Sequence, residues 1–140
     1  MVNIVKNSTP RVKIIQKLYS KITNPDEKII YNKSQYKKFI KDVTEGTLER
    51  KELIEETIEK FLKDDIDLKR TDKLLKIIIS AAVFELLYKH NNPKKVIISE
   101  YLFASEYFLE KVQIGYLNAI LDKIANVLRK DEKNSKKNKV

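Results

Sequence analysis

The side chains best suited to chemistry in this sequence are basic and aromatic, and they suit polyanion binding better than catalysis. A short N-terminal stretch combines three basic residues with an amide and a phenol ring, namely Arg11, Lys13, Lys17, Gln16 and Tyr19. Single-stranded RNA is held by basic residues along its phosphates and by aromatic rings beneath its bases. Tyr19 fits a core position as well as a stacking platform, so these residues favour RNA binding only weakly.

The net charge of +9 is concentrated at two ends of the chain. Residues 1–21 carry +5 and residues 129–140 carry +4, whereas the residues between them are neutral. Clustered lysine and arginine displace condensed counterions from phosphates, so a neutral body with basic ends is typical of a polyanion-binding protein. For residues 130–140, a tail that only improves solubility remains an equal alternative.

Residues with catalytic or metal-binding potential are scarce. The chain has no cysteine, which excludes disulfides, zinc–thiolate sites and thiol nucleophiles. His90 is the one histidine and cannot form a metal site or a catalytic triad alone. With only Gly46 and Gly115, neither phosphate-cradling glycine motif is possible. We therefore expect no enzyme activity, no cofactor and no metal.

Apolar side chains at spacings of three and four predict the helices that would position the basic residues. The first helix begins at Thr9-Pro10, a capping residue followed by proline, and its apolar stripe is Val12, Ile15, Leu18, Tyr19 and Ile22. Arg11, Lys13 and Lys17 are expected off that stripe. A second helix is expected from a cap at Ser34 to Gly46, with Tyr36, Phe39, Ile40 and Val43 inward, and a third covers residues 53–62.

Residues 74–88 are almost continuously apolar and predict a helix buried on nearly every side. Glu85 lies within it, and a buried carboxylate must be paired or hydrogen-bonded. We expect Glu85 to tie helix ends together rather than to catalyse a reaction. After Pro93 a fifth helix is expected, with Val96, Phe103, Ala104 and Tyr107 inward. A sixth follows Glu110-Lys111, with Tyr116 near its start and Leu117, Ile120, Leu121, Ile124 and Leu128 inward.

These elements predict one helical domain over residues 9–130, with halves at about 9–65 and 66–130. Residues 1–8 are expected to be flexible and residues 131–140 to form a basic disordered tail. No apolar run reaches membrane-spanning length and the N-terminus lacks a signal-peptide core. We expect a soluble cytoplasmic protein.

Several segments, taken together, resemble the NusB family. Arg11-Val-Lys-Ile-Ile-Gln-Lys-Leu-Tyr19 is similar to its opening helix, with the pattern Gln-x-Leu-Tyr. Ala82-Val-Phe-Glu-Leu86 is similar to Ala-x-Tyr-Glu-Leu, and Lys95-Val-Ile-Ile-Ser-Glu100 to Lys-Val-Ala-Ile-Asn-Glu. The most telling segment is Tyr116-Leu-Asn-Ala-Ile-Leu-Asp-Lys123, which is similar to Phe-Val-Asn-Gly-Val-Leu-Asp-Lys. The resemblance extends over about residues 9–130, in order and at matching spacing.

The resemblance implies an all-α, NusB-like compact domain of two three-helix halves. It also implies an RNA-binding transcription antitermination factor. NusB pairs with NusE (ribosomal protein S ten), and the pair binds boxA-type single-stranded RNA of nascent ribosomal RNA operon transcripts, as part of the RNA polymerase antitermination complex. The partners expected from the resemblance are therefore this RNA, NusE and that complex, with no membrane.

The RNA-binding residues implied by the resemblance are Arg11, Gln16, Tyr19, Phe108 and Tyr116, to which charge alone adds Lys6 and Lys13. Two departures bear on this site. The family's opening arginine cluster is thinned here, and Leu75 stands where the family usually has an acid near the NusE surface. They leave open an alternative, a helical protein-binding adaptor of the same fold with lost or weak RNA affinity.

Overall fold

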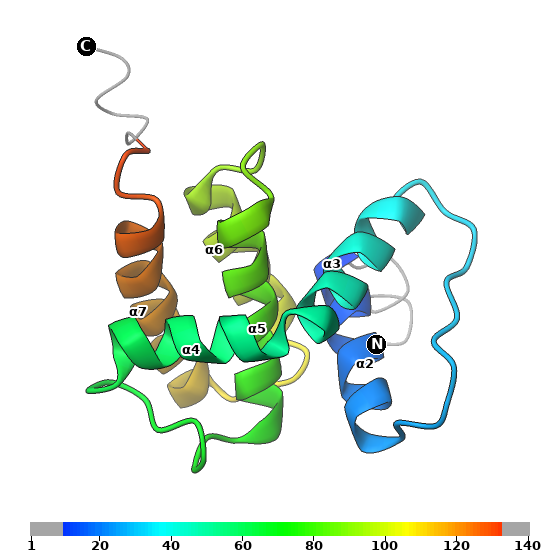
Figure 1. Cartoon of the computed structure of the whole chain (residues 1–140), viewed down its shortest axis with the longest axis horizontal. Helices are drawn as coiled ribbons and strands as arrows, with labels where there is room; N and C mark the ends of the chain where they lie inside the picture. The colour runs from blue at the N-terminus through cyan, green and yellow to red at the C-terminus, as the bar shows by residue number, and fades with distance from the viewer. Residues whose placement is uncertain (1–9, 133–140) are drawn as a thin grey trace.

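All regular secondary structure in the computed structural model, which describes residues 10–132, is helical (Figure 1). In chain order the helices are α2 (Pro10–Thr23), α3 (Lys37–Glu49), α4 (Lys51–Leu62), α5 (Lys73–Tyr88), α6 (Lys94–Ser105) and α7 (Lys111–Leu128). Over these residues the expected all-α fold is confirmed. None of these helices has the length and apolarity needed to cross a lipid bilayer.

Helix α5 is the centre of the fold and contacts each of the other five helices. It begins where the Asp72 side chain accepts a hydrogen bond from the Leu75 N–H at 3.2 Å, and it ends at Tyr88. Ten of its side chains are buried, and burying an aliphatic side chain contributes roughly 1.5–3 kcal/mol. The predicted helix over 74–88 is therefore confirmed, with its start one residue earlier.

In Figure 1, α2 and α3 lie on one side of α5 and α7 lies on the other, while α6 packs against α5 and contacts both α2 and α7. Helix α4 runs across the front of α5 and contacts α7. Side chains from both expected halves therefore pack against α5 in one core. The expected division near residue 65 stays a prediction. The expected flexible segment 1–8 and most of the expected tail 131–140 lie outside the described residues.

Helix α3 differs from the prediction at both ends. It starts at Lys37 rather than after a Ser34 cap, and Tyr36 precedes it without a side-chain capping bond. It also continues through Gly46 to Glu49. A Cβ atom on Gly46 would overlap the ring of Phe84 on α5, well inside van der Waals contact. Gly46 therefore permits close approach of α3 to α5 rather than ending the helix.

The expected inner face of α6 was correct at Ala104, which is buried, and at Tyr107, which packs half-buried against the core, but wrong at Val96 and Phe103. Val96 and Phe103 are 45% and 46% exposed, whereas the buried apolar side chains are Ile97, Tyr101 and Ala104. Both sets repeat at helical spacing, so periodicity alone did not distinguish them. Ile22 and Tyr36, expected in the core, are 41% and 49% exposed, because each lies next to the polar connection between α2 and α3.

Helix α7 agrees with the prediction in its start and in its inner face. A capping box begins it, in which the Glu110 N–H donates to the Gln113 side chain at 3.1 Å. Leu117, Ile120, Leu121 and Ile124 are buried as expected.

Candidate nucleic-acid interface

Three of the residues expected to bind RNA lie together on the outer face of α2. Lys13, Gln16 and Tyr19 follow one another at intervals of three, which makes them neighbours on a helix surface. Gln16 is exposed, Tyr19 is 42% exposed and Lys13 is half-buried. The opposite face holds the buried side chains of Ile14 and Leu18, so packing of these apolar residues turns this polar face outward.

The ring of Tyr19 has a cation close to it. Lys73, the first residue of α5, places its Nζ atom 5.9 Å from the ring centroid. Tyr19 therefore belongs to the surface and not to the core, which resolves the two readings of this residue. An exposed ring beside an ammonium group could stack on a base while the cation lies near a phosphate.

Arg11 is placed differently from the expectation that it lies off the apolar stripe. Its side chain is buried, and Nε and Nη2 donate to Oε2 and Oε1 of Glu85 at 3.0 and 2.6 Å. The guanidinium also lies 4.8 Å from the Phe39 ring centroid. Arg11 precedes Ile15 and Leu18 by four and seven residues, which is the spacing of the buried face. That spacing explains the correction: the side chain points inward and is engaged by a carboxylate.

Glu85 is the centre of a buried polar network that joins three helices. Besides the Arg11 bonds, its Oε2 accepts a hydrogen bond from the Tyr101 hydroxyl at 2.5 Å. Asn92 Nδ2 lies 3.5 Å from Oε1. Burial, and then the charge of Glu85, raise the pKa of Tyr101 well above its usual value. The expectation that Glu85 ties helices together is confirmed, since it fixes α2 against α5 and α6.

The Arg11–Glu85 pair keeps its charges in the interior. Burial alone would lower the pKa of Arg11, but the hydrogen bond and charge of Glu85 outweigh it and raise that pKa. A bidentate arginine–carboxylate pair of this kind is strongly oriented. Arg11 was expected to contact RNA directly. Its ion pair with Glu85 instead holds α2, and with it the exposed face of α2, in one position.

The two aromatic residues expected from the C-terminal part of the chain differ in their surroundings. Phe108 is half-buried between α6 and α7, and Tyr116 on α7 is 38% exposed. The Tyr116 hydroxyl donates to the Asp65 carbonyl oxygen at 2.6 Å, and burial followed by the charge of Asp65 raises its pKa. Among the described residues, no hydrogen bond or ring contact joins either residue to the α2 face. Lys6 lies outside the described residues.

One buried cation was missed by the sequence analysis, which counted it in the basic C-terminal end. Arg129 donates to the carbonyl oxygens of Leu86 at 2.7 Å and Lys89 at 3.1 Å, both at the end of α5. Its Nη1 also bonds Glu132 Oε1 at 2.5 Å. Arg129 follows Ala125 by four residues and Leu121 by eight, which places it in line with the buried side chains of α7. This spacing is the sequence feature that could have identified it.

Over residues 10–132 no group of three or more His, Cys, Asp or Glu side chains is arranged to hold a metal ion. The arrangement of residues here can bind, position and neutralise an anion.

Comparison with known proteins gives consistent matches. The model of the NusB family matches residues 2–126. "Transcription antitermination protein NusB" of Rhodopseudomonas palustris is 33% identical over 94 residues, which is 67% of this chain and 54% of that protein. The protein of the same description from Nitrobacter hamburgensis is also 33% identical over 94 residues, covering 67% and 59%. The matched part is thus little more than half the length of these relatives.

A solved structure of T. maritima NusB has a similar fold. It matches with a TM-score of 0.72 and 21% sequence identity, and the match covers 95% of this chain and 99% of that one. This likeness concerns the arrangement of the helices.

Proposed function

This chain belongs to the NusB family of transcription antitermination factors, a non-enzymatic family, and on that premise we propose that it binds RNA in transcription antitermination. The proposed ligand is boxA-type single-stranded RNA of nascent ribosomal RNA operon transcripts. The proposed protein partner is NusE (ribosomal protein S ten), within the RNA polymerase antitermination complex. Such a factor acts in the cytoplasm.

The observation that carries this proposal is the exposed face of α2. Lys13, Gln16 and Tyr19 lie at successive helical intervals, and Lys73 adds a second cation beside the Tyr19 ring. This set offers a charge for phosphate, an amide for a base edge and a ring for stacking. The RNA-binding set that we propose is therefore Lys6, Lys13, Gln16, Tyr19, Phe108 and Tyr116, with Arg11 as the residue that positions α2.

The test is RNA binding over a series of salt concentrations, with and without NusE. A short boxA-type RNA should bind with an affinity that falls steeply as salt rises and increases when NusE is added. Lys13→Gln should reduce the slope of log K against log salt by about 0.7, the value for one phosphate contact to a single strand. Lys95→Gln on α6 removes the same charge from an exposed position and should leave the slope unchanged. Absence of RNA binding by the unmodified protein would overturn the proposal.

Tyr116 allows its ring and its hydroxyl to be tested separately. Tyr116→Phe removes the bond to the Asp65 carbonyl oxygen and keeps the ring, so RNA affinity should stay within about twofold. Tyr116→Ala removes the ring and should weaken binding by about 1–3 kcal/mol if a base stacks on it. Fluorescence anisotropy with labelled RNA measures both, with circular dichroism melts as the control for folding. Equal losses in the two variants would assign the effect to the hydroxyl bond and exclude stacking.

The second candidate is the protein-binding adaptor with lost or weak RNA affinity. One observation favours it: the Arg11 guanidinium is buried against Glu85, which removes the expected arginine from phosphate contact. An adaptor would bind NusE and show no salt-dependent RNA affinity, so the same titrations distinguish the two functions.

A further inference from the structure

A groove runs along α2 on the side that faces the connection between α2 and α3. It consists of two adjacent hollows of about 300 and 180 Å³, which share Gln16 and Lys17 as common lining residues. The first is also lined by α2 residues Ser20 and Lys21 and by residues 27–30. The second is lined by Lys13, by Tyr31, Asn32 and Ser34 of the connection, and by Lys37 and Ile40 of α3. Together the hollows follow α2 for most of its length.

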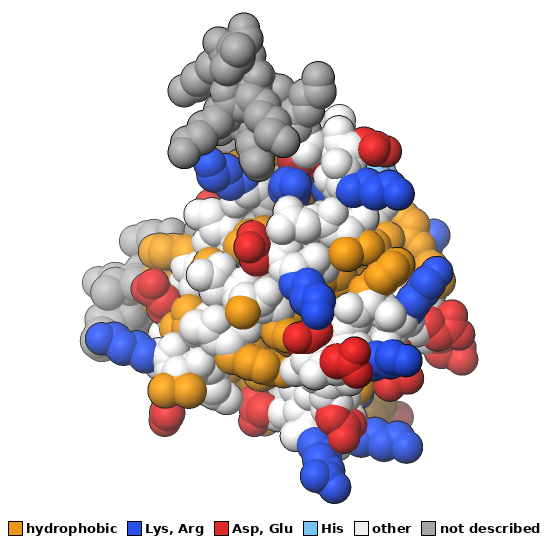
Figure 2. Space-filling model, turned by 90° about the vertical axis from the view of Figure 1, so that its left-hand side faces the viewer, with side chains coloured by type: hydrophobic (Ala, Val, Ile, Leu, Met, Phe, Trp, Pro, Cys, Tyr) orange, Lys and Arg blue, Asp and Glu red, His pale blue; other side chains and the backbone are white. Residues whose placement is uncertain are grey.

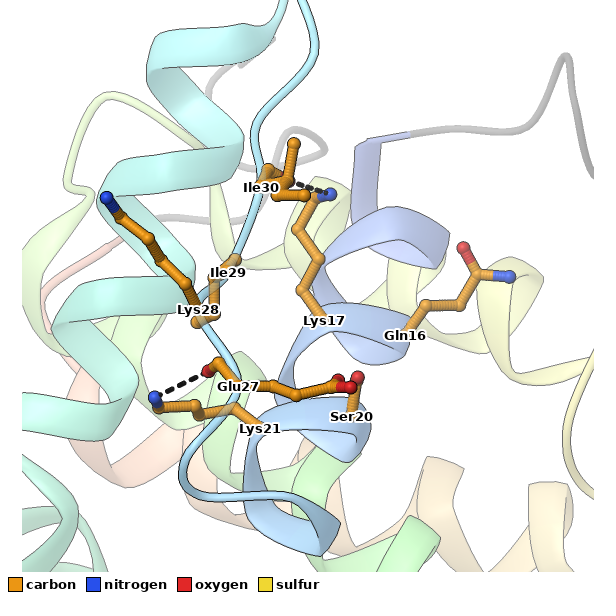
Figure 3. A pocket seen from close by; sticks show the side chains of 8 residues that line it. All are labelled: Gln16, Lys17, Ser20, Lys21, Glu27, Lys28, Ile29 and Ile30. Atoms are coloured by element: carbon orange, nitrogen blue, oxygen red, sulfur yellow. Dashed lines mark hydrogen bonds between the residues drawn. The ribbon is translucent and has the colours of Figure 1, made fainter.

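Two lysines of α2 hold the connection in place and so give the groove a defined wall. Lys17 Nζ donates to the Ile30 carbonyl oxygen at 2.7 Å. One turn further on, Lys21 Nζ donates to the carbonyl oxygens of Pro25 and Glu27 at 2.7 and 2.8 Å. Figure 3 shows both side chains reaching from the helix across to the connection, which runs antiparallel to α2. The groove therefore exists before any ligand binds.

The groove has an excess of positive charge. Lys13, Lys17 and Lys37 line the second hollow, where no acidic residue is present among the lining side chains. In the first hollow Glu27 is opposed by three lysines, Lys17, Lys21 and Lys28. Burial, and then the charge of Lys13, lower the pKa of Lys17. An anion placed in the groove would relieve this concentration of positive charge.

None of the five lysines that line the groove has an acidic partner within residues 10–132, and of these only Lys17 and Lys21 donate to backbone carbonyl oxygens. Lys13, Lys28 and Lys37 form no ion pair there, whereas Lys38 pairs with Asp42 and Lys76 with Glu55. The face of the molecule that carries α4 and α7 has a different character. Figure 2 shows acidic, basic and apolar side chains interspersed on that face. The lysine-lined groove is thus distinct in charge and has ammonium groups available for a ligand.

We propose that this groove carries the phosphate backbone of the bound single-stranded RNA beyond the α2 face, with Lys28 and Lys37 as phosphate contacts. Lys13 and Gln16 belong both to the α2 face and to the groove, so one strand can pass from one to the other. Residues 13–21 span about 12 Å along the helix axis, a length that accommodates a few nucleotides. This inference rests on the proposed RNA-binding function and extends its site to residues 28–37.

The test compares two double variants. Lys28→Gln/Lys37→Gln removes the two proposed phosphate contacts, and Lys60→Gln/Lys95→Gln is the matched control. The control removes the same charge from exposed positions on α4 and α6 that line neither hollow. Removing two phosphate contacts should lower the salt slope by about 1.4 and the affinity on the order of twentyfold at about 0.1 M salt. The control pair should change neither quantity. Circular dichroism melts check that both variants fold as the unmodified protein does.

A second measurement uses the same RNA lengthened by a few uridines at one end or the other. The unmodified protein should gain affinity from one of the two extensions, and Lys28→Gln/Lys37→Gln should gain none. If the unmodified protein binds no RNA, the proposed function itself fails. If it binds RNA but the double variant keeps the affinity, the salt slope and the gain from extension, the groove is not part of the site. Loss of NusE binding with unchanged RNA binding would make the groove a protein contact and overturn the inference.

Discussion

Replacing Glu85 with alanine should lower the free energy of unfolding by about 3–5 kcal/mol, the usual effect of removing one partner from a buried ion pair. The carboxylate is fully buried and receives two hydrogen bonds from Arg11 and one from the Tyr101 hydroxyl. Its removal leaves a buried guanidinium and a buried hydroxyl without their acceptor. Urea denaturation measures the change, with the helical circular dichroism signal as the readout of unfolding.

Two further variants separate the network from the loss of a single charge. Glu100→Ala removes a half-exposed carboxylate 3.9 Å from Arg11 Nη1, and it should cost about 1 kcal/mol or less. The combination Arg11→Met, Glu85→Leu and Tyr101→Phe replaces the whole network with apolar groups and should recover most of the stability. An unfolding free energy for Glu85→Ala equal to that of the unmodified protein would contradict the role of this network.

Gly46→Ala should destabilise the protein by about 1–3 kcal/mol, the usual effect of overpacking a core. The added Cβ would overlap Cζ and Cε1 of Phe84, whose ring is buried on α5. Alanine otherwise favours a helix over glycine by about 1 kcal/mol, so the measured change contains both effects with opposite signs.

Gly115→Ala is the matched control, since a Cβ at Gly115 on α7 meets no atom within 4 Å. There the helix-forming preference acts alone, and stability should rise by about 0.5–1 kcal/mol. In the double variant Gly46→Ala/Phe84→Leu, the loss should be smaller than the sum of the two single losses, because the ring that is overlapped is gone. Thermal and urea unfolding measure the unmodified protein, the three single variants Gly46→Ala, Gly115→Ala and Phe84→Leu, and the double variant. A stabilised Gly46→Ala protein would show that α3 and α5 can separate at little cost.

The helices that sequence analysis placed well are those with a distinctive apolar pattern. Helix α5 is apolar on nearly every side, and α7 has one stripe that begins after a capping box. The errors concern helices in which two adjacent rows of side chains are equally apolar, and residue types that have two common structural roles. Val96 and Phe103 repeat at the same spacing as the buried Ile97 and Ala104. Gly46 was read as a helix end because its true function depends on a ring that is 38 residues away in sequence.

The candidate site was predicted in part. Resemblance to a family and local charge led to Lys13, Gln16 and Tyr19, and the structure places these residues on one exposed face. Arg11 was misplaced because its partner Glu85 is 74 residues distant in the sequence. The groove lysines Lys28 and Lys37 gave no signal, since their position depends on how a polar connection packs along α2.

Arg129 has a consequence for the order in which this protein is made. Its guanidinium bonds the carbonyl oxygens of Leu86 and Lys89, which precede it by 43 and 40 residues. The ribosome synthesises those carbonyl groups long before it adds the arginine that will bind them. A nascent chain that ends before residue 129 therefore has its central helix incompletely capped, with backbone acceptors still bonded to water. Native structure is completed late in translation. Premature termination just ahead of Arg129 should therefore yield a substrate for cellular proteases, although α2 to α7 have all been synthesised by then.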